Sequence, residues 1–141
     1  MIKNMQKLIY FLVVVILVVS TAAVARVPDK TNIKLGTKNW INSENYFVCN
    51  FNKKPSMGVT ILVLKAFKKT GERSSVFTIT GKYGMPEMRA HDSEETKFRQ
   101  NKAGDYLLPV DVAMPGAWEV EINIKNKEGS TYSGVLNFDV K

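Results

Sequence analysis

Residues 117–126 read AWEVEINIKN, and the alternation in this stretch decides the fold class. Apolar and polar side chains follow one another without a break: Trp118, Val120, Ile122 and Ile124 against Glu119, Glu121, Asn123 and Lys125. Successive side chains of a β-strand point to opposite faces of its sheet. The stretch therefore predicts a strand with its apolar face in a core and its polar face in water.

The same period of two recurs on both sides of this strand. It predicts six more strands, at residues 46–51, 58–67, 75–83, 94–99, 106–112 and 131–140. Gly71 and Gly129 fall in the turns between them, where a positive φ is easiest for glycine. The predicted fold is all-β, an immunoglobulin-like seven-stranded antiparallel sandwich over residues 46–141. Its expected core residues are Phe77, Ile79, Tyr106, Leu108, Trp118, Val120, Ile122, Leu136 and Phe138.

Tyr106 follows Gly104 and Asp105 directly before a predicted strand. This placement suits a tyrosine corner, in which the hydroxyl bonds back to nearby backbone and fixes a crossing between strands. An ordinary core tyrosine explains the sequence equally well.

The first 25 residues have the pattern of an export segment. Lys3 and Lys7 precede an unbroken apolar run at residues 8–19, and Ala23 and Ala25 stand in the A-x-A relation that signal peptidase recognises. A cleaved signal peptide is favoured slightly over a retained membrane anchor, since residues 8–25 could just span a bilayer. Either way, the rest of the chain is expected in the periplasm or another extracytoplasmic location, with residues 26–45 as a polar linker or stalk.

Charge and cysteine content exclude several classes of function. The net charge of the 141 residues is +7, and removing Lys3 and Lys7 leaves +5. Lysines are scattered among acidic residues, which argues against nucleic acid as a partner. Cys49 is the only cysteine and alternates in phase with two phenylalanines, so it is expected to be buried and inert. No Ser–His pair, Cys–His pair or phosphate-binding glycine loop is evident, and the chain is not expected to be an enzyme.

A ten-residue stretch, YGMPEMRAHD at residues 83–92, holds the residues most suited to chemistry. Met85 and Met88 lie three residues apart around Pro86, and His91 is the only histidine. Loops between consecutive antiparallel strands alternate between the two ends of a sandwich. Met57, which closes the first loop, and Met114, in the fifth, should therefore share one end with this stretch. The predicted ligands are Met85, Met88, His91, Met57 and Met114.

These side chains permit two functions of different classes. Neutral, soft thioethers favour Cu(I), and an added imidazole would also hold Cu(II). The first hypothesis is therefore an exported copper-binding protein. The alternative is a non-metal interaction module in which the same loop docks a membrane or envelope protein partner, because methionine also serves in ordinary packing.

Three motifs carry a resemblance to a known family. GMPEM, AGDY and MPGAWEVEI, within residues 54–140, together resemble the YtkA-like domain, which is grouped with FixH-like proteins. The resemblance implies an exported immunoglobulin-like sandwich whose members are associated with metal handling or oxidase assembly. It would mark Met85, Pro86, Met88 and the turn from Met114 to Trp118. The N-terminal segment departs from the FixH-like pattern, because it looks more like a removable signal.

Overall fold

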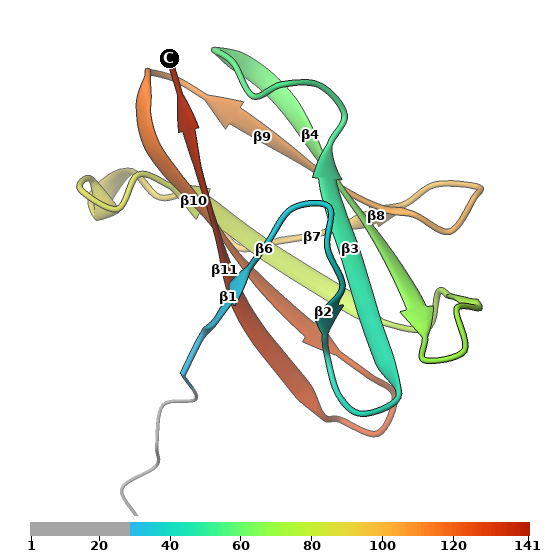
Figure 1. The fold of residues 1–141 in the computed structure, drawn as a ribbon. Helices are drawn as coiled ribbons and strands as arrows, with labels where there is room; N and C mark the ends of the chain where they lie inside the picture. Colours follow the sequence, from blue (N-terminus) through green and yellow to red (C-terminus); the bar gives the residue numbers. More distant parts are fainter. Residues whose placement is uncertain (1–28) are drawn as a thin grey trace, which may run out of the picture.

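The computed structural model describes residues 29–141, which form two facing β-sheets (Figure 1). The predicted signal peptide or anchor at residues 1–25 lies outside the described residues. Within residues 29–141, no helix is long and apolar enough to cross a membrane. The all-β prediction with two packed sheets is confirmed for this part of the chain.

The first sheet has the order β1-β11-β10-β6-β7. Its strands are β1 (Thr31–Ile33), β11 (Thr131–Val140), β10 (Gly116–Lys125), β6 (Thr78–Gly84) and β7 (Thr96–Lys97). All neighbours pair antiparallel except β1, which runs parallel to β11. The central strand β10 is the alternating stretch that decides the fold class.

The second sheet has the order β2-β3-β4-β9-β8, and β5 also pairs with β4. Its strands are β2 (Asn39–Trp40), β3 (Asn45–Phe51), β4 (Gly58–Lys68), β5 (Arg73–Ser74), β8 (Arg99–Gln100) and β9 (Tyr106–Val112). All pairs in this sheet are antiparallel. One short 3-10 helix, η1 (Arg89–His91), lies between β6 and β7.

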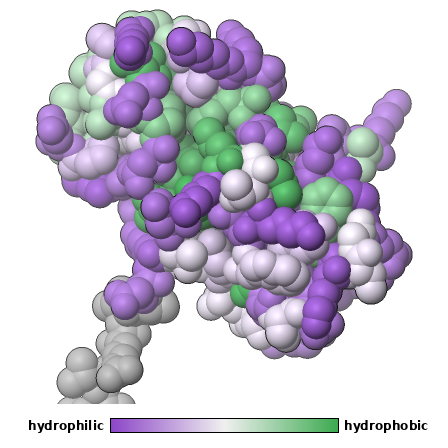
Figure 2. Space-filling view, in the orientation of Figure 1, coloured by the Kyte–Doolittle hydropathy of each residue, from purple (hydrophilic) through white to green (hydrophobic). Residues whose placement is uncertain are grey.

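The core between the sheets is built from the apolar phase of the long strands. All nine predicted core residues are buried, and the largest side chains with almost no exposure include Tyr106, Phe47 and Leu62. Cys49 is fully buried, as predicted, and burial raises the pKa of its thiol to about 12. The visible surface is mostly hydrophilic, with hydrophobic side chains gathered near the middle of the view (Figure 2).

The predicted strand at residues 94–99 is wrong as a single strand. The chain forms β7 in the first sheet, places Phe98 in the core at 3% exposure, and then forms β8 in the second sheet. The Phe98 backbone N–H donates to Ile79 O at 2.8 Å, which holds the crossing. A charged stretch with one buried ring could not reveal this change of sheet through its periodicity.

The structure also corrects the predicted linker and strand arrangement. Residues 31–33 and 39–40, expected in a linker over 26–45, pair with β11 and β3. Ile33 is buried at 3% exposure, so this part of the chain belongs to the sandwich. The sheets therefore contain short strands beyond the predicted seven, and the parallel β1 departs from a purely antiparallel sandwich.

Tyr106 connects distant parts of the chain through its hydroxyl. The hydroxyl oxygen accepts a hydrogen bond from Phe77 N at 3.0 Å, 29 residues earlier. The bond is therefore long-range, and it fixes the segment that enters β6 against β9. The hydroxyl is bonded to backbone, as in a tyrosine corner, but not to the nearby backbone that such a corner uses.

Candidate metal centre

Three loops meet at one end of the sandwich, here called the methionine end: residues 52–57, 85–95 and 113–115. Strand register places them together, because Gly58 pairs with Val112 and Gly84 pairs with Glu119. Consecutive loops still alternate between the two ends of the sandwich, although residues 96–100 form two short strands instead of one. β7 pairs antiparallel with β6 and β8 pairs antiparallel with β9, so the chain crosses between the sheets without changing direction.

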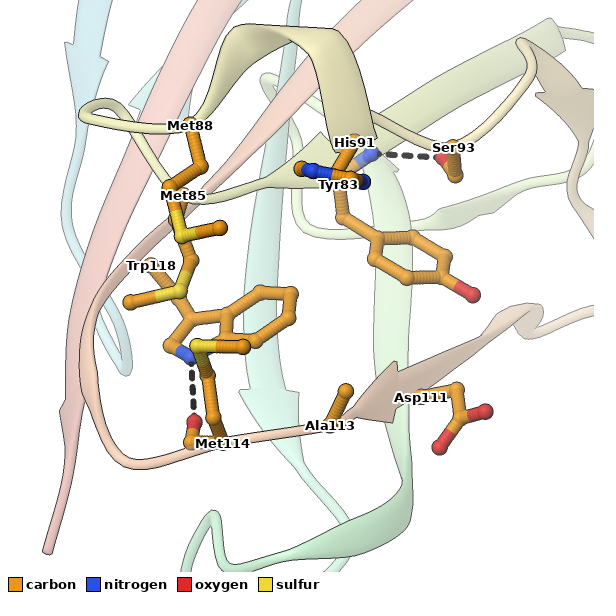
Figure 3. A pocket seen from close by; sticks show the side chains of 9 residues that line it. All are labelled: Tyr83, Met85, Met88, His91, Ser93, Asp111, Ala113, Met114 and Trp118. Carbon is orange, nitrogen blue, oxygen red and sulfur yellow. Dashed lines mark hydrogen bonds between the residues drawn. The ribbon is translucent and has the colours of Figure 1, made fainter.

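A cavity of about 410 Å³ opens at the methionine end (Figure 3). Figure 3 shows the thioethers of Met85, Met88 and Met114 extending toward a common space beside Trp118, with His91 set to one side near Tyr83. The lining is mainly apolar and comes from two of the three loops, 85–95 and 113–115, and from the adjoining ends of β6, β9 and β10. Its residues are Tyr83, Met85, Met88, His91, Ser93, Asp111, Ala113, Met114 and Trp118.

Two successive tight turns form the wall that carries Met85, Met88 and His91. The Met88 N–H donates to Met85 O at 2.9 Å, and the His91 N–H donates to Met88 O at 2.9 Å. Pro86 occupies the second position of the first turn, where its fixed φ is suited to the backbone. Turns with three-residue spacing bring side chains at i and i+3 to the same side. Because these three residues are spaced three apart in the sequence, they lie along the same wall of the cavity.

Hydrogen bonds close this loop at its base. The Tyr83 N–H donates to Ser93 Oγ at 2.9 Å, and the Ser93 N–H donates back to Tyr83 O at 2.8 Å. The reciprocal pair fixes where the chain leaves β6 and returns toward β7. The intervening residues are thereby held as a closed loop over the end of the first sheet.

An ion pair fastens the middle of the same loop to β10. Arg89 Nη1 pairs with the carboxylate of Glu119, and Asp92 and Glu121 lie 3.8 and 4.0 Å from the same nitrogen. The hydrogen bond to Glu119 raises the pKa of the Arg89 guanidinium. The expectation that Glu119 faces water is wrong, because the loop covers it and leaves the residue 7% exposed.

The β9–β10 loop forms the opposite wall. Trp118 Nε1 donates to Met114 O at 2.9 Å, which joins the loop to the start of β10. Gly116 has a φ of +131°, and a Cβ added there would lie 2.8 Å from the Met85 methyl carbon. The backbone at Gly116 therefore makes room for Met85, which is half-buried and packs against the core.

Not every predicted ligand reaches the cavity. Met57 lies at the methionine end but is 53% exposed and does not line it. Met114 lines it and remains 40% exposed, and His91 lines it from an exposed position. Sequence reasoning missed Asp111, Ser93 and Tyr83 as lining residues, since each reads as part of an ordinary strand or turn.

The donor set is suited to a soft ion. Three neutral thioethers and one imidazole share the cavity, with the Asp111 carboxylate in its lining. Thioether sulfur favours Cu(I), whereas hard ions prefer carboxylate and carbonyl oxygens. Within residues 29–141, no group of three or more His, Cys, Asp or Glu side chains is arranged to hold a metal ion. A metal here would therefore depend on methionine.

Comparison with known proteins yields a likeness of fold. No family model matches the chain, and no curated protein matches its sequence. The structure resembles the crystal structure of the PmoD soluble domain from Methylocystis sp. ATCC 49242 (Rockwell), with a TM-score of 0.50. Sequence identity is 10%, and the match covers 74% of this chain and 96% of that chain. At this identity the likeness concerns the fold, and the YtkA-like and FixH-like resemblance stays a prediction.

Proposed function

We propose that this chain is an exported copper-binding protein with a role in metal handling. It holds Cu(I) through the thioethers of Met85, Met88 and Met114. One observation carries the proposal, namely that three thioethers from two loops line one mainly apolar cavity. The same side chains spread over a flat surface would have favoured the docking module instead. His91 is the additional ligand at the side of the cavity, and Met57 is left out of the ligand set.

Export rests on the sequence of the first 25 residues, with their lysines, apolar run and A-x-A pattern. We further propose that the chain is a divergent member of the YtkA-like and FixH-like group, on the strength of GMPEM, AGDY and MPGAWEVEI. Oxidase assembly is the more specific role that this resemblance implies.

The proposal is tested by competing the full-length chain, purified in detergent, against a colorimetric Cu(I) chelator without oxygen. Replacing Met85 and Met88 together by leucine keeps the apolar volume, so the free energy of unfolding should fall by less than about 1.5 kcal/mol. Cu(I) affinity should fall at least tenfold, because two of three soft donors are lost.

Met57→Leu is the matched control, since Met57 lies at the same end of the sandwich but outside the cavity. It should leave Cu(I) affinity unchanged. Equal affinity in the double-leucine variant and the wild type would refute the copper site and favour the docking module.

A further inference from the structure

The cavity has an aromatic wall that the thioether ligand set does not use. Trp118 lines it from β10 while remaining only 6% exposed. Its indole N–H lies in the plane of the ring and donates to Met114 O at 2.9 Å. That bond engages the edge of the indole and not its ring faces.

The indole is held in a fixed relation to two of the thioethers. The Trp118–Met114 bond joins it to the residue that supplies one sulfur. Met85 meets the same turn from the other loop, with its methyl carbon 2.8 Å from the position of a Cβ on Gly116. Figure 3 shows the thioether end of Met114 next to the indole and that of Met85 beside the base of the Trp118 side chain. An ion held between these sulfurs would lie next to the aromatic system.

We propose that Trp118 is a cation–π partner for a soft monovalent cation in this cavity, an inference that rests on the proposed function. Thioethers are neutral, so a bound Cu(I) or Ag(I) keeps its single positive charge. A cation within about 6 Å of an indole centroid is attracted by the negative face of the ring. The indole face offers no lone pair to a hard ion and leaves less room for water, so it favours monovalent soft ions over hydrated divalent ones.

Tryptophan emission gives a direct test, because the chain has only two tryptophans. Trp40 pairs with Tyr46 at the beginning of β3, which places it near the opposite end of the sandwich, and it is 47% exposed. In the full-length Trp40→Phe variant in detergent, Trp118 is the only emitter. Adding one equivalent of Ag(I), as nitrate without chloride, should reduce its emission by more than half. The Trp118→Phe variant, in which only Trp40 emits, should show no change.

Affinity provides the second arm of the test. Ag(I) affinity by calorimetry should fall from wild type to Trp118→Phe and again to Trp118→Leu, the last by at least fivefold, because leucine lacks a π face. Circular dichroism checks that each variant is folded. If Trp118→Leu does not fold, the tryptophan-emission measurement decides the question.

The outcomes separate the two proposals. Stoichiometric Ag(I) binding that is lost in Met85→Leu/Met88→Leu, with Trp118 emission unchanged and affinity kept in Trp118→Phe, would overturn the cation–π inference alone. Failure of the wild-type chain to bind Ag(I) would overturn both proposals.

Discussion

Gly116 is the residue at which backbone conformation and ligand position are most closely coupled. Its φ of +131° is rarely adopted by other residues, and an added Cβ would lie 2.8 Å from the Met85 methyl. Gly116→Ala should therefore lower the free energy of unfolding by about 1–3 kcal/mol. It should also weaken Cu(I) binding, because Met85 must move.

Gly129→Ala provides the control for this prediction. Gly129 also has a positive φ, of +86°, but a Cβ there meets no atom within 4 Å. Urea denaturation should show a loss of stability in both variants, whereas chelator competition should show weaker copper binding only in Gly116→Ala. Equal copper affinity in the two variants would show that Met85 does not depend on this contact.

Cys49 makes the free energy of unfolding depend on pH in the alkaline range. Its folded-state pKa of about 12 lies above the ordinary value of 9.0 because burial penalises the thiolate. Below pH 9 the thiol is protonated in both the folded and the unfolded chain, so its contribution to the free energy of unfolding is fully present. As pH rises from 9 toward 12, the unfolded chain loses this proton first, and stability falls.

Denaturation between pH 8.5 and 11 checks this expectation. Cys49→Ala should lose less stability over the interval than the wild type, whatever its starting stability. Parallel curves for the two proteins would contradict a buried thiol with a raised pKa.

At the scale of elements, the loop between β6 and β7 depends on its attachment to β10 through Arg89 and Glu119. Arg89→Ala should loosen the loop without unfolding the sandwich, because the core residues lie elsewhere. Hydrogen exchange at the His91 amide should become several-fold faster, and Cu(I) affinity should fall.

Lys68→Ala is the matched control, since the Lys68–Glu72 pair joins two exposed side chains on β4 and the following turn. Exposed pairs contribute little, so neither exchange at His91 nor copper affinity should change. Unchanged exchange at His91 in Arg89→Ala would mean that the base of the loop alone positions the ligands.

The accuracy of the sequence-based prediction also varies between elements. Long strands such as β9 and β11 were placed correctly because each repeats its alternation several times. Strands of two or three residues, such as β7 and β1, contain too few side chains to show any period. Their positions depend on tertiary pairing, which local sequence does not encode.

Among the site residues, the shared end of Met85, Met88 and Met114 was predictable, because it follows from counting strand reversals. Whether a side chain at that end enters the cavity was not predictable, and Met57 is the example. Glu119 shows the same limit on the polar face, since alternation cannot reveal that a distant loop covers a strand.

At the scale of the molecule, the sandwich includes residues before β3. Ile33 is 3% exposed, and its side chain packs over Gly134, where an added Cβ would lie 2.7 Å from it. Ile33→Ala should lower the free energy of unfolding by about 2–5 kcal/mol.

Leu35→Ala, at a position that is 39% exposed, should change stability by only about 0.5 kcal/mol. Urea denaturation of the two variants makes the comparison. An Ile33→Ala change as small as that of Leu35→Ala would restore the interpretation of this region as a linker.

The central claim is that methionine sulfur binds copper at one end of the sandwich. X-ray absorption at the copper edge, on the full-length chain loaded with one equivalent of Cu(I), measures the ligand atoms directly. We expect a copper shell dominated by sulfur in the wild type, and loss of most of that sulfur in Met85→Leu/Met88→Leu. A shell made only of nitrogen and oxygen, or a sulfur shell that is the same in both proteins, would contradict the claim.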